Sequence, residues 1–286
     1  PEQAQCCPQC GLTWAEFNER GRLGCARCYE VFADSLLPLL QRLQGAMNHV
    51  GKLPSRGSGV FTTNHQIKRL QQQLSTALEK EEYEEAARLR DEIYAFQGSH
   101  PDSDVVLSSR VRLARNIANI QFPNMANESE LMAVEMAANE AKQSLSEEYQ
   151  EEMTYVKMSD LDRVDREILL EKHLVSPQLI SVPVHRGIVI NEAADITFMV
   201  NEEDHFRLQM LAGGLQLESL WEKANRADDA LESKINFAFT DKWGYLTACP
   251  TNVGTGMRAS VMVHVPALVR TKRIKRIIQG ILKFSY

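Results

Sequence analysis

Apolar and polar side chains alternate at β-strand spacing in three segments of the second half of the chain. In residues 196–207, Ile196, Phe198 and Val200 share one side, while the polar positions share the other: Thr197, Asn201, Glu203, His205 and Arg207. This pattern predicts one strand that buries one face and gathers a carboxylate, an imidazole and a guanidinium on the other. Such a face is either a solvated edge or part of a site.

Two further segments place arginines on one face of a predicted strand. In "VVLSSRVRLARN" that face carries Ser108, Arg110 and Arg112, and in "GMRASVMVHVPAL" it carries Arg258, Ser260, Met262 and His264. Strands that bring several arginines together repel one another unless anions lie between them. A polyphosphate would resolve this repulsion, because guanidinium forks match phosphate oxygens. Separate solvated edges are the alternative.

The first half of the chain shows helical spacing instead. Within residues 63–97, leucines recur at 70, 74 and 78, and apolar residues recur again at 86, 89, 93 and 96, with charged residues between the two runs. This pattern predicts two antiparallel helices. A short hairpin buries little surface alone, so we expect it to pair with a copy of itself or with a partner. Residues 34–62, ahead of it, are interpreted as a linker.

Five of the six cysteines lie within residues 6–28. Two C-x₂-C pairs, Cys7 with Cys10 and Cys25 with Cys28, present four thiolates for tetrahedral zinc and leave no open position for a catalytic water. Residues 1–33 contain few apolar side chains, so the metal is expected to supply much of the folding energy of this module. Four reduced structural cysteines are the alternative, and Cys6 is an alternative ligand with less regular spacing.

Composition narrows the class of protein. The chain has 286 residues, of which 44% are hydrophobic and 24% charged, as in globular proteins. A net charge of −6 argues against a general nucleic-acid coat. The sequence contains neither a membrane-spanning apolar run nor a secretory leader, and the cysteine spacing is not that of a disulfide framework. We therefore predict a cytoplasmic protein that does not enter membranes.

A glycine-rich segment, "CPTNVGTGMRAS", imitates a dinucleotide-binding fingerprint through Gly254, Gly256 and Ala259. No strand–glycine–helix unit surrounds it, so this interpretation is disfavoured. A tight loop that delivers Arg258 to a phosphate, or that approaches a substrate closely, is the better use of these glycines.

Four ordered motifs, "SSRVRLARN", "EKHLVSP", "VNEEDHFR" and "CPTNVGTGMRAS", resemble the catalytic core of phosphagen kinases, and most of all the McsB-type protein arginine kinases. The predicted catalytic core spans residues 101–286, and the resemblance covers nearly all of residues 102–286. It implies an α+β fold, an antiparallel sheet flanked by helices, that transfers the γ-phosphoryl group of ATP to arginine side chains of proteins with the help of Mg²⁺. About residues 5–97 resemble the zinc and UVR-hairpin part of the activator of these kinases, McsA.

The same resemblance assigns roles to individual residues. Glu203 would orient the acceptor guanidinium and accept its proton, and Cys249 would lie near that guanidinium. A guanidinium is a poor nucleophile, so a carboxylate within hydrogen-bond reach is needed. The nucleotide would contact a larger set: Ser108, Ser109, Arg110, Val111, Arg112, His173, Arg207, Arg258, Ala259, Ser260, Val261 and Met262.

The sequence departs from the family pattern after "RIIQGILKFSY", where phosphagen kinases continue into another phosphate-binding arginine and a second catalytic acid. Two functions therefore stay open: a protein arginine kinase with its Zn²⁺-binding activator in cis, or a non-catalytic adaptor fragment. The implied partners are protein substrates carrying arginine, activator–kinase contacts in cis or in trans, a second copy of the chain in a homo-oligomer, the Clp-type protease system and a stress-response repressor.

Overall fold

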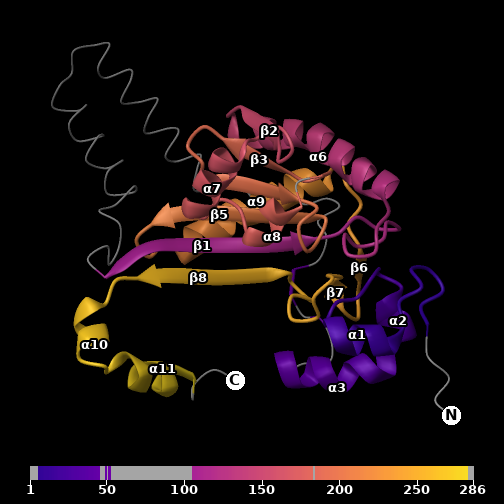
Figure 1. Ribbon diagram of the computed structural model, residues 1–286, viewed down its shortest axis with the longest axis horizontal. Coiled ribbons are helices and arrows are strands. Elements are labelled where there is room, and N and C mark those ends of the chain that lie inside the picture. The colour runs from indigo at the N-terminus through magenta and orange to yellow at the C-terminus, as the bar shows by residue number, and fades with distance from the viewer. Residues whose placement is uncertain (1–5, 46–48, 50, 53–104, 183, 283–286) are drawn as a thin grey trace.

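The computed structural model describes residues 6–45, 49, 51–52, 105–182 and 184–282 (Figure 1). The helical hairpin expected at residues 63–97 lies outside these ranges. Below, residues 6–44 are called the N-terminal module, and residues 105–282 the core domain. No helix in the described ranges is long and apolar enough to cross a membrane.

The N-terminal module contains three helices: α1 (Trp14–Arg20), α2 (Cys28–Val31) and α3 (Ala33–Gln44). Helix α1 begins with a reciprocal pair of hydrogen bonds between Thr13 and Glu16, which satisfies the backbone N–H groups of these two residues at its start. Helix α3 occupies the start of the stretch predicted as a linker, so that prediction is wrong for residues 34–44. Burial of Leu36 and Leu40 stabilises the helix despite Pro38 within it.

A six-stranded antiparallel sheet with strand order β2-β3-β4-β5-β1-β8 forms the centre of the core domain. Its strands are β1 (Val106–Arg115), β2 (Met153–Lys157), β3 (Gly187–Asn191), β4 (Ile196–Val200), β5 (Phe206–Gly213) and β8 (Met257–Val263). A second sheet pairs β6 (Phe239–Thr240) with β7 (Gly244–Tyr245). The predicted antiparallel sheet with flanking helices is confirmed, and this topology has no place for the parallel unit that a dinucleotide fingerprint requires.

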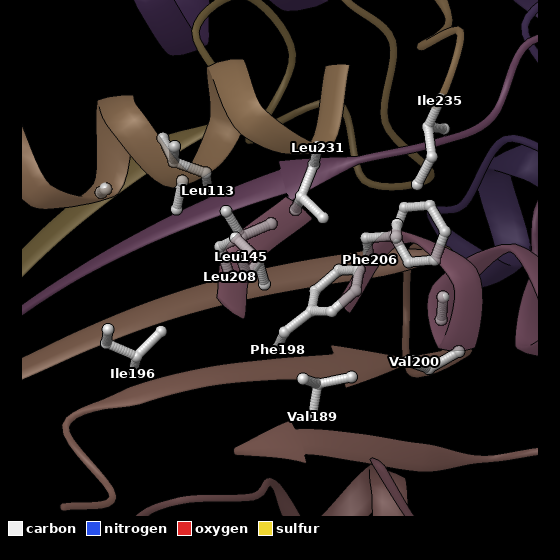
Figure 2. Packing of buried hydrophobic residues seen from close by; sticks show 14 of the residues in the cluster. Leu113, Leu145, Val189, Ile196, Phe198, Val200, Phe206, Leu208, Leu231 and Ile235 are labelled. Carbon is white, nitrogen blue, oxygen red and sulfur yellow. The ribbon is translucent and has the colours of Figure 1, made fainter. Parts of the chain in front are cut away.

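Two long helices, α6 (Glu128–Tyr149) and α9 (Leu217–Glu232), cover one face of this sheet. Figure 2 shows the apolar core between the sheet and these helices. Leu113 and Phe198 of the sheet belong to one cluster with Leu145 of α6 and Leu231 of α9. The other face is covered beneath β3 and β4 by a smaller cluster that includes Leu179 of α8 (Pro177–Ser181). Helix α7 (Arg163–Glu171) precedes α8, and α10 (Pro266–Arg270) and α11 (Ile274–Leu282) follow β8.

The single strand predicted for residues 196–207 is instead a β-hairpin. Strand β4 ends at Val200, which pairs with Phe206 at the start of β5. Asn201 turns the chain with a positive φ of 57°, a backbone conformation that asparagine tolerates better than most residues, and its N–H donates to the His205 carbonyl across 2.8 Å. The acids of this segment therefore lie in a turn, because the polar run that followed the apolar one marked a change of direction.

The N-terminal module and the core domain share one apolar cluster. Phe17, Leu23 and Phe32 of the module are buried with Phe122 and Trp243 of the core domain. Tyr29 adds a buried hydrogen bond, in which its hydroxyl donates to the carbonyl oxygen of Thr247 at 2.9 Å. The module is therefore held by apolar burial against the core domain in addition to any metal, which the small number of apolar residues in its own sequence did not suggest.

Candidate active site

The turn between β4 and β5 presents two glutamates to one arginine. Arg207 of β5 places Nη1 at 2.8 Å from Glu202 Oε2 and Nη2 at 3.0 Å from Glu203 Oε2. Glu202 is only 4% exposed and also accepts a hydrogen bond from the hydroxyl of Ser176. Glu203 is the more accessible of the two carboxylates, with its side chain 15% exposed.

A cleft of about 450 Å³ opens beside this turn. It brings Glu203 and Cys249, both predicted as catalytic, together with three arginines predicted to bind nucleotide, and its lining is Arg112, Ala114, Ser176, Pro177, Gln178, Glu202, Glu203, Arg207, Cys249, Thr251, Asn252, Gly256 and Arg258. Cys249 is half-buried, with its Sγ 3.0 Å from the hydroxyl of Thr251. One concave site thus combines a carboxylate, a thiol and a cluster of guanidinium groups.

Strand register explains why the arginines meet. Arg112 of β1 lies opposite Arg258 of β8, and Ala114, two residues further along β1, lies opposite Arg207 of β5. Directly opposed residues of an antiparallel pair point to the same face of a sheet, so these guanidinium groups share one face. Arg110 also lies on this face and donates from Nε to the Ser260 hydroxyl at 3.3 Å.

The arginine cluster has the character of an anion site. Burial, reinforced by the charges of Arg110, Arg207 and Arg258, lowers the pKa of Arg112 to about 10. Within the described part of the chain, the buried Nε of Arg112 has no hydrogen-bond partner. Mutual repulsion and an unpaired buried donor are both relieved by a polyanion with several oxygens.

The other residues predicted to bind nucleotide divide between the two sides of the sheet. Ser109 and Val111 face the apolar core, and the Ser109 hydroxyl donates to Gly214 O at 2.7 Å. On β8, Ala259 and Val261 alternate with Arg258, Ser260 and Met262, so they point to the side opposite the arginines. The nucleotide roles of these four outward- or core-facing residues stay predictions without support from side-chain placement.

The backbone of His173 contacts the face of the sheet that carries the arginine cluster, called the arginine face below. His173 follows α7 with a φ of 59°, and its carbonyl oxygen accepts a hydrogen bond of 3.0 Å from Nε2 of Gln209. Gln209 of β5 lies opposite Arg112 of β1. The imidazole of His173 is exposed. Ser108 lies on the same face of β1 as Arg110.

Asp204, which follows Glu203 in the hairpin, turns away from the cleft. Asp204 is fully buried, and its Oδ1 accepts 2.6 Å hydrogen bonds from Asn116 Nδ2 and from the Ala248 N–H. Burial raises the pKa of Asp204 to about 6. Asp204 thereby connects the turn between β4 and β5 to Ala248, the residue before Cys249. The sequence did not reveal this contact, although Asp204 stands next to Glu203.

His205 does not join Glu203 and Arg207, so the shared polar face predicted for these three residues is wrong. Its ring lies in the interior, where Nδ1 accepts from the Ile117 N–H at 3.0 Å and Nε2 therefore donates to Gln121 O at 2.8 Å. Burial lowers the pKa of His205 to about 4. This histidine is a satisfied structural residue, because the turn at Asn201 breaks the alternation on which the prediction rested.

The glycine loop before β8 approaches β1 closely. Gly256 has a φ of 64°, and a Cβ there would lie 2.5 Å from the Ala114 carbonyl oxygen, so only glycine fits. Arg115 Nη1 donates to the carbonyl of Thr255 at 2.9 Å. The loop leads directly into Arg258, as expected from a loop that delivers this arginine.

The four predicted metal ligands form a second, separate centre. The sulfur atoms of Cys7, Cys10, Cys25 and Cys28 lie within 4.8 Å of one another, with Cys7–Cys25 at 3.6 Å, Cys10–Cys28 at 3.4 Å and Cys25–Cys28 at 3.8 Å. A tetrahedral zinc with Zn–S bonds of about 2.3 Å separates its sulfurs by about 3.8 Å, so the cluster fits this metal. Cys6 is exposed and lies outside the cluster.

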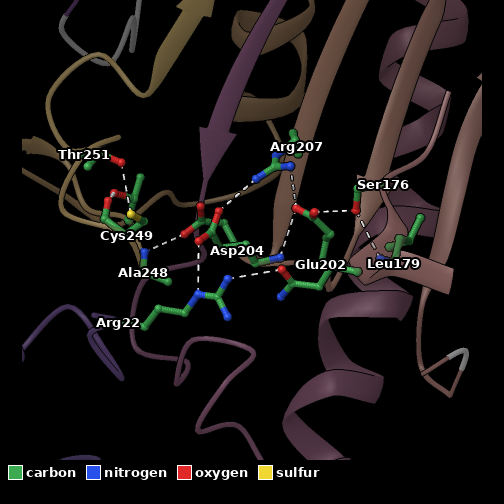
Figure 3. A network of polar contacts seen from close by, with 12 residues as sticks. Arg22, Ser176, Leu179, Glu202, Asp204, Arg207, Ala248, Cys249 and Thr251 are labelled. Atoms are coloured by element: carbon green, nitrogen blue, oxygen red, sulfur yellow. Dashed lines mark hydrogen bonds and ion pairs between the residues drawn. The ribbon is translucent and has the colours of Figure 1, made fainter. Parts of the chain in front are cut away.

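Arg22 of the N-terminal module reaches Glu203, and no sequence signal indicated this contact. Its Nε donates to Glu203 Oε1 at 3.1 Å, and its Nη2 donates to Gln178 Oε1 at 3.2 Å. Figure 3 shows Arg22 and Arg207 approaching the acidic turn from different sides, with Cys249 nearby.

Three family models match the chain. Residues 133–285 match the catalytic domain of ATP:guanido phosphotransferases, residues 5–51 match the McsA central zinc-finger domain, and residues 65–98 match the UvrB/uvrC motif.

Named relatives and solved structures agree with these models. A protein-arginine kinase of Halothermothrix orenii is 49% identical over 186 residues, which are 65% of this chain and 52% of the relative. One from Bacillus cereus is 46% identical over 66% of this chain and 53% of the relative. The chain therefore spans about half the length of the relatives it matches.

Among solved structures, a duplicated taurocyamine kinase from Schistosoma mansoni with bound transition-state-analogue components superposes with a TM-score of 0.63 at 26% identity, over 86% of this chain and 32% of that one. A lombricine kinase, at 22% identity and a TM-score of 0.58 over 87% of this chain and 63% of that one, shows the same fold. The family match covers more than half of the chain, and the site just described lies on that fold. The chain belongs to the ATP:guanido phosphotransferase family, with a McsA-type zinc-finger segment and a UVR motif ahead of its catalytic domain.

Proposed function

We propose that this chain carries the active site of a protein arginine kinase, which transfers the γ-phosphoryl group of ATP to arginine side chains of proteins. The main support is the single cleft that combines Glu203 and Cys249 with Arg112, Arg207 and Arg258. Relatives named protein-arginine kinase support a protein arginine as the acceptor. Because the chain spans about half the length of those relatives, their whole activity is put forward for it as a proposal.

The arginine face would hold the phosphates of ATP. Arg112 and Arg258 oppose each other across β1 and β8, so their guanidinium groups can bracket one phosphate chain. Arg207 now pairs with Glu202 and Glu203, and a bound γ-phosphate would compete with those carboxylates for its donors. Mg²⁺, which would arrive with ATP, neutralises part of the phosphate charge. The guanidinium groups supply the remainder from fixed positions, which is where most of the catalytic effect of such sites arises.

Glu203 would act on the acceptor. One Nη of the acceptor guanidinium attacks the γ-phosphorus, the bond from phosphorus to the β–γ bridging oxygen breaks, and ADP leaves with that electron pair. The proton lost by the attacking nitrogen passes to the Glu203 carboxylate. Cys249, on the same cleft, would lie beside the acceptor guanidinium and help to orient it.

The N-terminal module would serve as an activator in cis. Cys7, Cys10, Cys25 and Cys28 would hold one structural Zn²⁺, which fixes the segment that contacts the core domain. Activator–kinase contacts in trans, Clp-type proteases and stress-response repressors follow from the family resemblance alone. A homo-oligomer also follows from the short hairpin at residues 63–97, and a cytoplasmic location follows from the cysteine spacing and composition. All of these stay predictions.

Incubation of the full protein with ATP, Mg²⁺ and an arginine-rich protein tests the proposal. We expect acid-labile phosphate on arginine, and no phosphate on a matched substrate whose arginines are replaced by lysine. Absence of transfer, with ATP binding and module docking intact, would contradict the kinase and favour the non-catalytic adaptor.

A further inference from the structure

Arg22 stands at the only place where a side chain of the described N-terminal module bonds to the predicted catalytic carboxylate. It follows Gly21, the left-handed residue that ends α1, and precedes the metal-cluster residue Cys25 by three positions. Its guanidinium is anchored at both ends, with Nε on Glu203 Oε1 at 3.1 Å and Nη2 on Gln178 Oε1 at 3.2 Å. A planar guanidinium fixed twice defines the orientation of the groups it binds.

The Glu203 carboxylate is held from two directions. Arg22 occupies Oε1, while Arg207 Nη2 occupies Oε2 at 3.0 Å. These two contacts restrict rotation of the terminal torsion of the glutamate, which is otherwise broad and nearly free. A carboxylate offers about four acceptor directions, so two bonds fix its plane and leave directions for a third donor.

The position of Arg22 leaves the cleft available to that third donor. Glu203, Gln178 and Cys249 line the cleft, whereas Arg22 is absent from its lining among the described residues. The Arg22 side chain is 38% exposed and the Glu203 side chain 15%. Arg22 therefore bonds to Glu203 and Gln178, which line the cleft, without lining the cleft itself.

The backbone around Arg22 is fixed to the core domain. The Leu23 N–H donates to Ala248 O at 2.8 Å, and the Gly24 carbonyl accepts from the Phe122 N–H at 2.8 Å. A Cβ on Gly24 would lie 2.7 Å from Met125 Cγ and 2.8 Å from Cys10 Sγ, so this segment is wedged between the cysteine cluster and the core domain. The backbone directly after Arg22 is consequently fixed to the core domain, and this restricts the position of Arg22.

We propose that Arg22 is a positioning residue for Glu203: it aligns the carboxylate with the acceptor nitrogen from outside the cleft, and so gives the N-terminal module direct control of the chemical step. This inference rests on the proposed function, since it assigns Glu203 the task of accepting the acceptor's proton. It differs from a role of the module in stability alone, because only one side chain carries the effect.

Kinetic constants of Arg22→Met test the inference, since methionine keeps the apolar stem and removes the donors. We expect kcat for arginine phosphorylation to fall at least about ten-fold, because small misplacements of a catalytic group cost up to ~100-fold, with KM for ATP unchanged. Arg22→Lys should recover part of kcat, because its ammonium restores one charged donor. Arg20→Met, an exposed arginine of the same module, is the matched control and should leave kcat unchanged.

Two kinetic outcomes would overturn the inference. An unchanged kcat in Arg22→Met would make the contact incidental. A raised kcat, or a lowered KM for the arginine substrate, would make Arg22 an occupant that acceptors must displace. Metal content and unfolding midpoint equal to those of the wild type ensure that the module remains folded in each variant.

A crystal structure of Arg22→Met separates this inference from the proposed function. If the wild-type protein transfers no phosphate to arginine, the proposed function fails, yet the structure still decides the role of Arg22. We expect the Glu203 carboxylate to leave its present orientation while Arg207 keeps its contact with Glu202. An unmoved carboxylate would show that Arg22 does not position it.

Discussion

The backbone N–H of Leu23 donates a hydrogen bond to the carbonyl oxygen of Ala248 across 2.8 Å. Leu23 belongs to the N-terminal module, and Ala248 directly precedes Cys249 of the cleft. The Tyr29 hydroxyl adds a second bond, to Thr247 O at 2.9 Å. The module therefore contacts the backbone that carries Cys249, and loss of the module's structure should loosen this part of the cleft.

Metal removal should show this coupling. We expect about one equivalent of zinc per chain after desalting, because the four cysteine sulfurs already lie at separations suited to one tetrahedral ion. Chelation should unfold the module and strongly accelerate hydrogen exchange of the Leu23 amide, which donates to the Ala248 carbonyl oxygen, as measured by mass spectrometry or NMR. A metal-free protein whose Leu23 amide remains protected would contradict the structural role of the metal.

Removal of a charge from the buried ion pair between β1 and α9 should lower the free energy of unfolding more than removal of an exposed charge. Arg115 Nε and Nη2 donate to the two oxygens of Asp228 at 2.9 and 2.8 Å, and neither side chain is exposed. Burial alone would raise the pKa of Asp228, but Arg115 and Lys52 hold it below its ordinary value. Asp228→Asn should cost about 3–5 kcal/mol in the free energy of unfolding, because it leaves the charge of Arg115 buried without its partner.

Asp229→Asn is the matched control for this measurement. Asp229 also contacts Lys52, at 2.7 Å, but its side chain is 37% exposed, and partly exposed pairs contribute about 0–1 kcal/mol. Urea unfolding of both variants gives the comparison. Equal decreases in the free energy of unfolding would show that the buried Arg115–Asp228 pair contributes no more to stability than the partly exposed pair of Asp229.

Two buried neighbours, Asp204 and His205, should change the stability of the fold in opposite directions as pH changes. The pKa of His205 falls to about 4 in the fold, so below about 6.5 the unfolded chain binds a proton that the folded chain refuses, and stability decreases as pH falls through this window. The pKa of Asp204 rises to about 6, so above 3.8 the unfolded chain releases a proton that the folded chain keeps, and stability decreases as pH rises toward 6. Between these limits the two slopes oppose each other.

Asp204→Asn separates the two groups. The variant removes the buried charge that the fold carries at neutral pH, so we expect it to be more stable there by about 1–3 kcal/mol, since one pKa unit corresponds to about 1.4 kcal/mol. With only the His205 slope left, its stability should fall more steeply than that of the wild type as pH drops from about 6 to about 4. Urea unfolding across this range measures both effects. Parallel pH profiles would contradict the assignment.

The arginine face should control nucleotide affinity. Arg112→Gln removes a half-buried charge whose Nε lacks a partner among the described residues, and a charged hydrogen bond contributes about 1.5–3 kcal/mol. Affinity for ATP with Mg²⁺, measured by calorimetry, should fall by about ten- to a hundred-fold. Arg163→Gln, in an exposed pair with Glu167 on α7, should change nothing. Equal affinity in the two variants would remove Arg112 from the phosphate site.

Periodicity in the sequence located β1 and β8 and predicted that their arginines share one face, because alternation follows from local geometry. It misplaced His205, since a turn at Asn201 is invisible to a period-two count. The C-x₂-C spacing identified all four cysteines of the cluster, because ligand spacing is itself local. The contacts of Arg22 with Glu203 and of Leu23 with Ala248 join distant segments through tertiary packing, and no local pattern encodes them.

Glu203→Gln tests whether Glu203 accepts the proton of the acceptor guanidinium, because glutamine keeps the shape of the side chain but does not take a proton. With ATP binding and arginine phosphorylation measured on the same preparation, we expect transfer to fall by about 10²- to 10⁴-fold, as for loss of a general base. The dissociation constant for ATP should stay within a few-fold of the wild type, since the phosphates are assigned to the arginines. A variant that keeps its transfer rate while losing ATP affinity would place Glu203 in the phosphate site and show that it is not the proton acceptor.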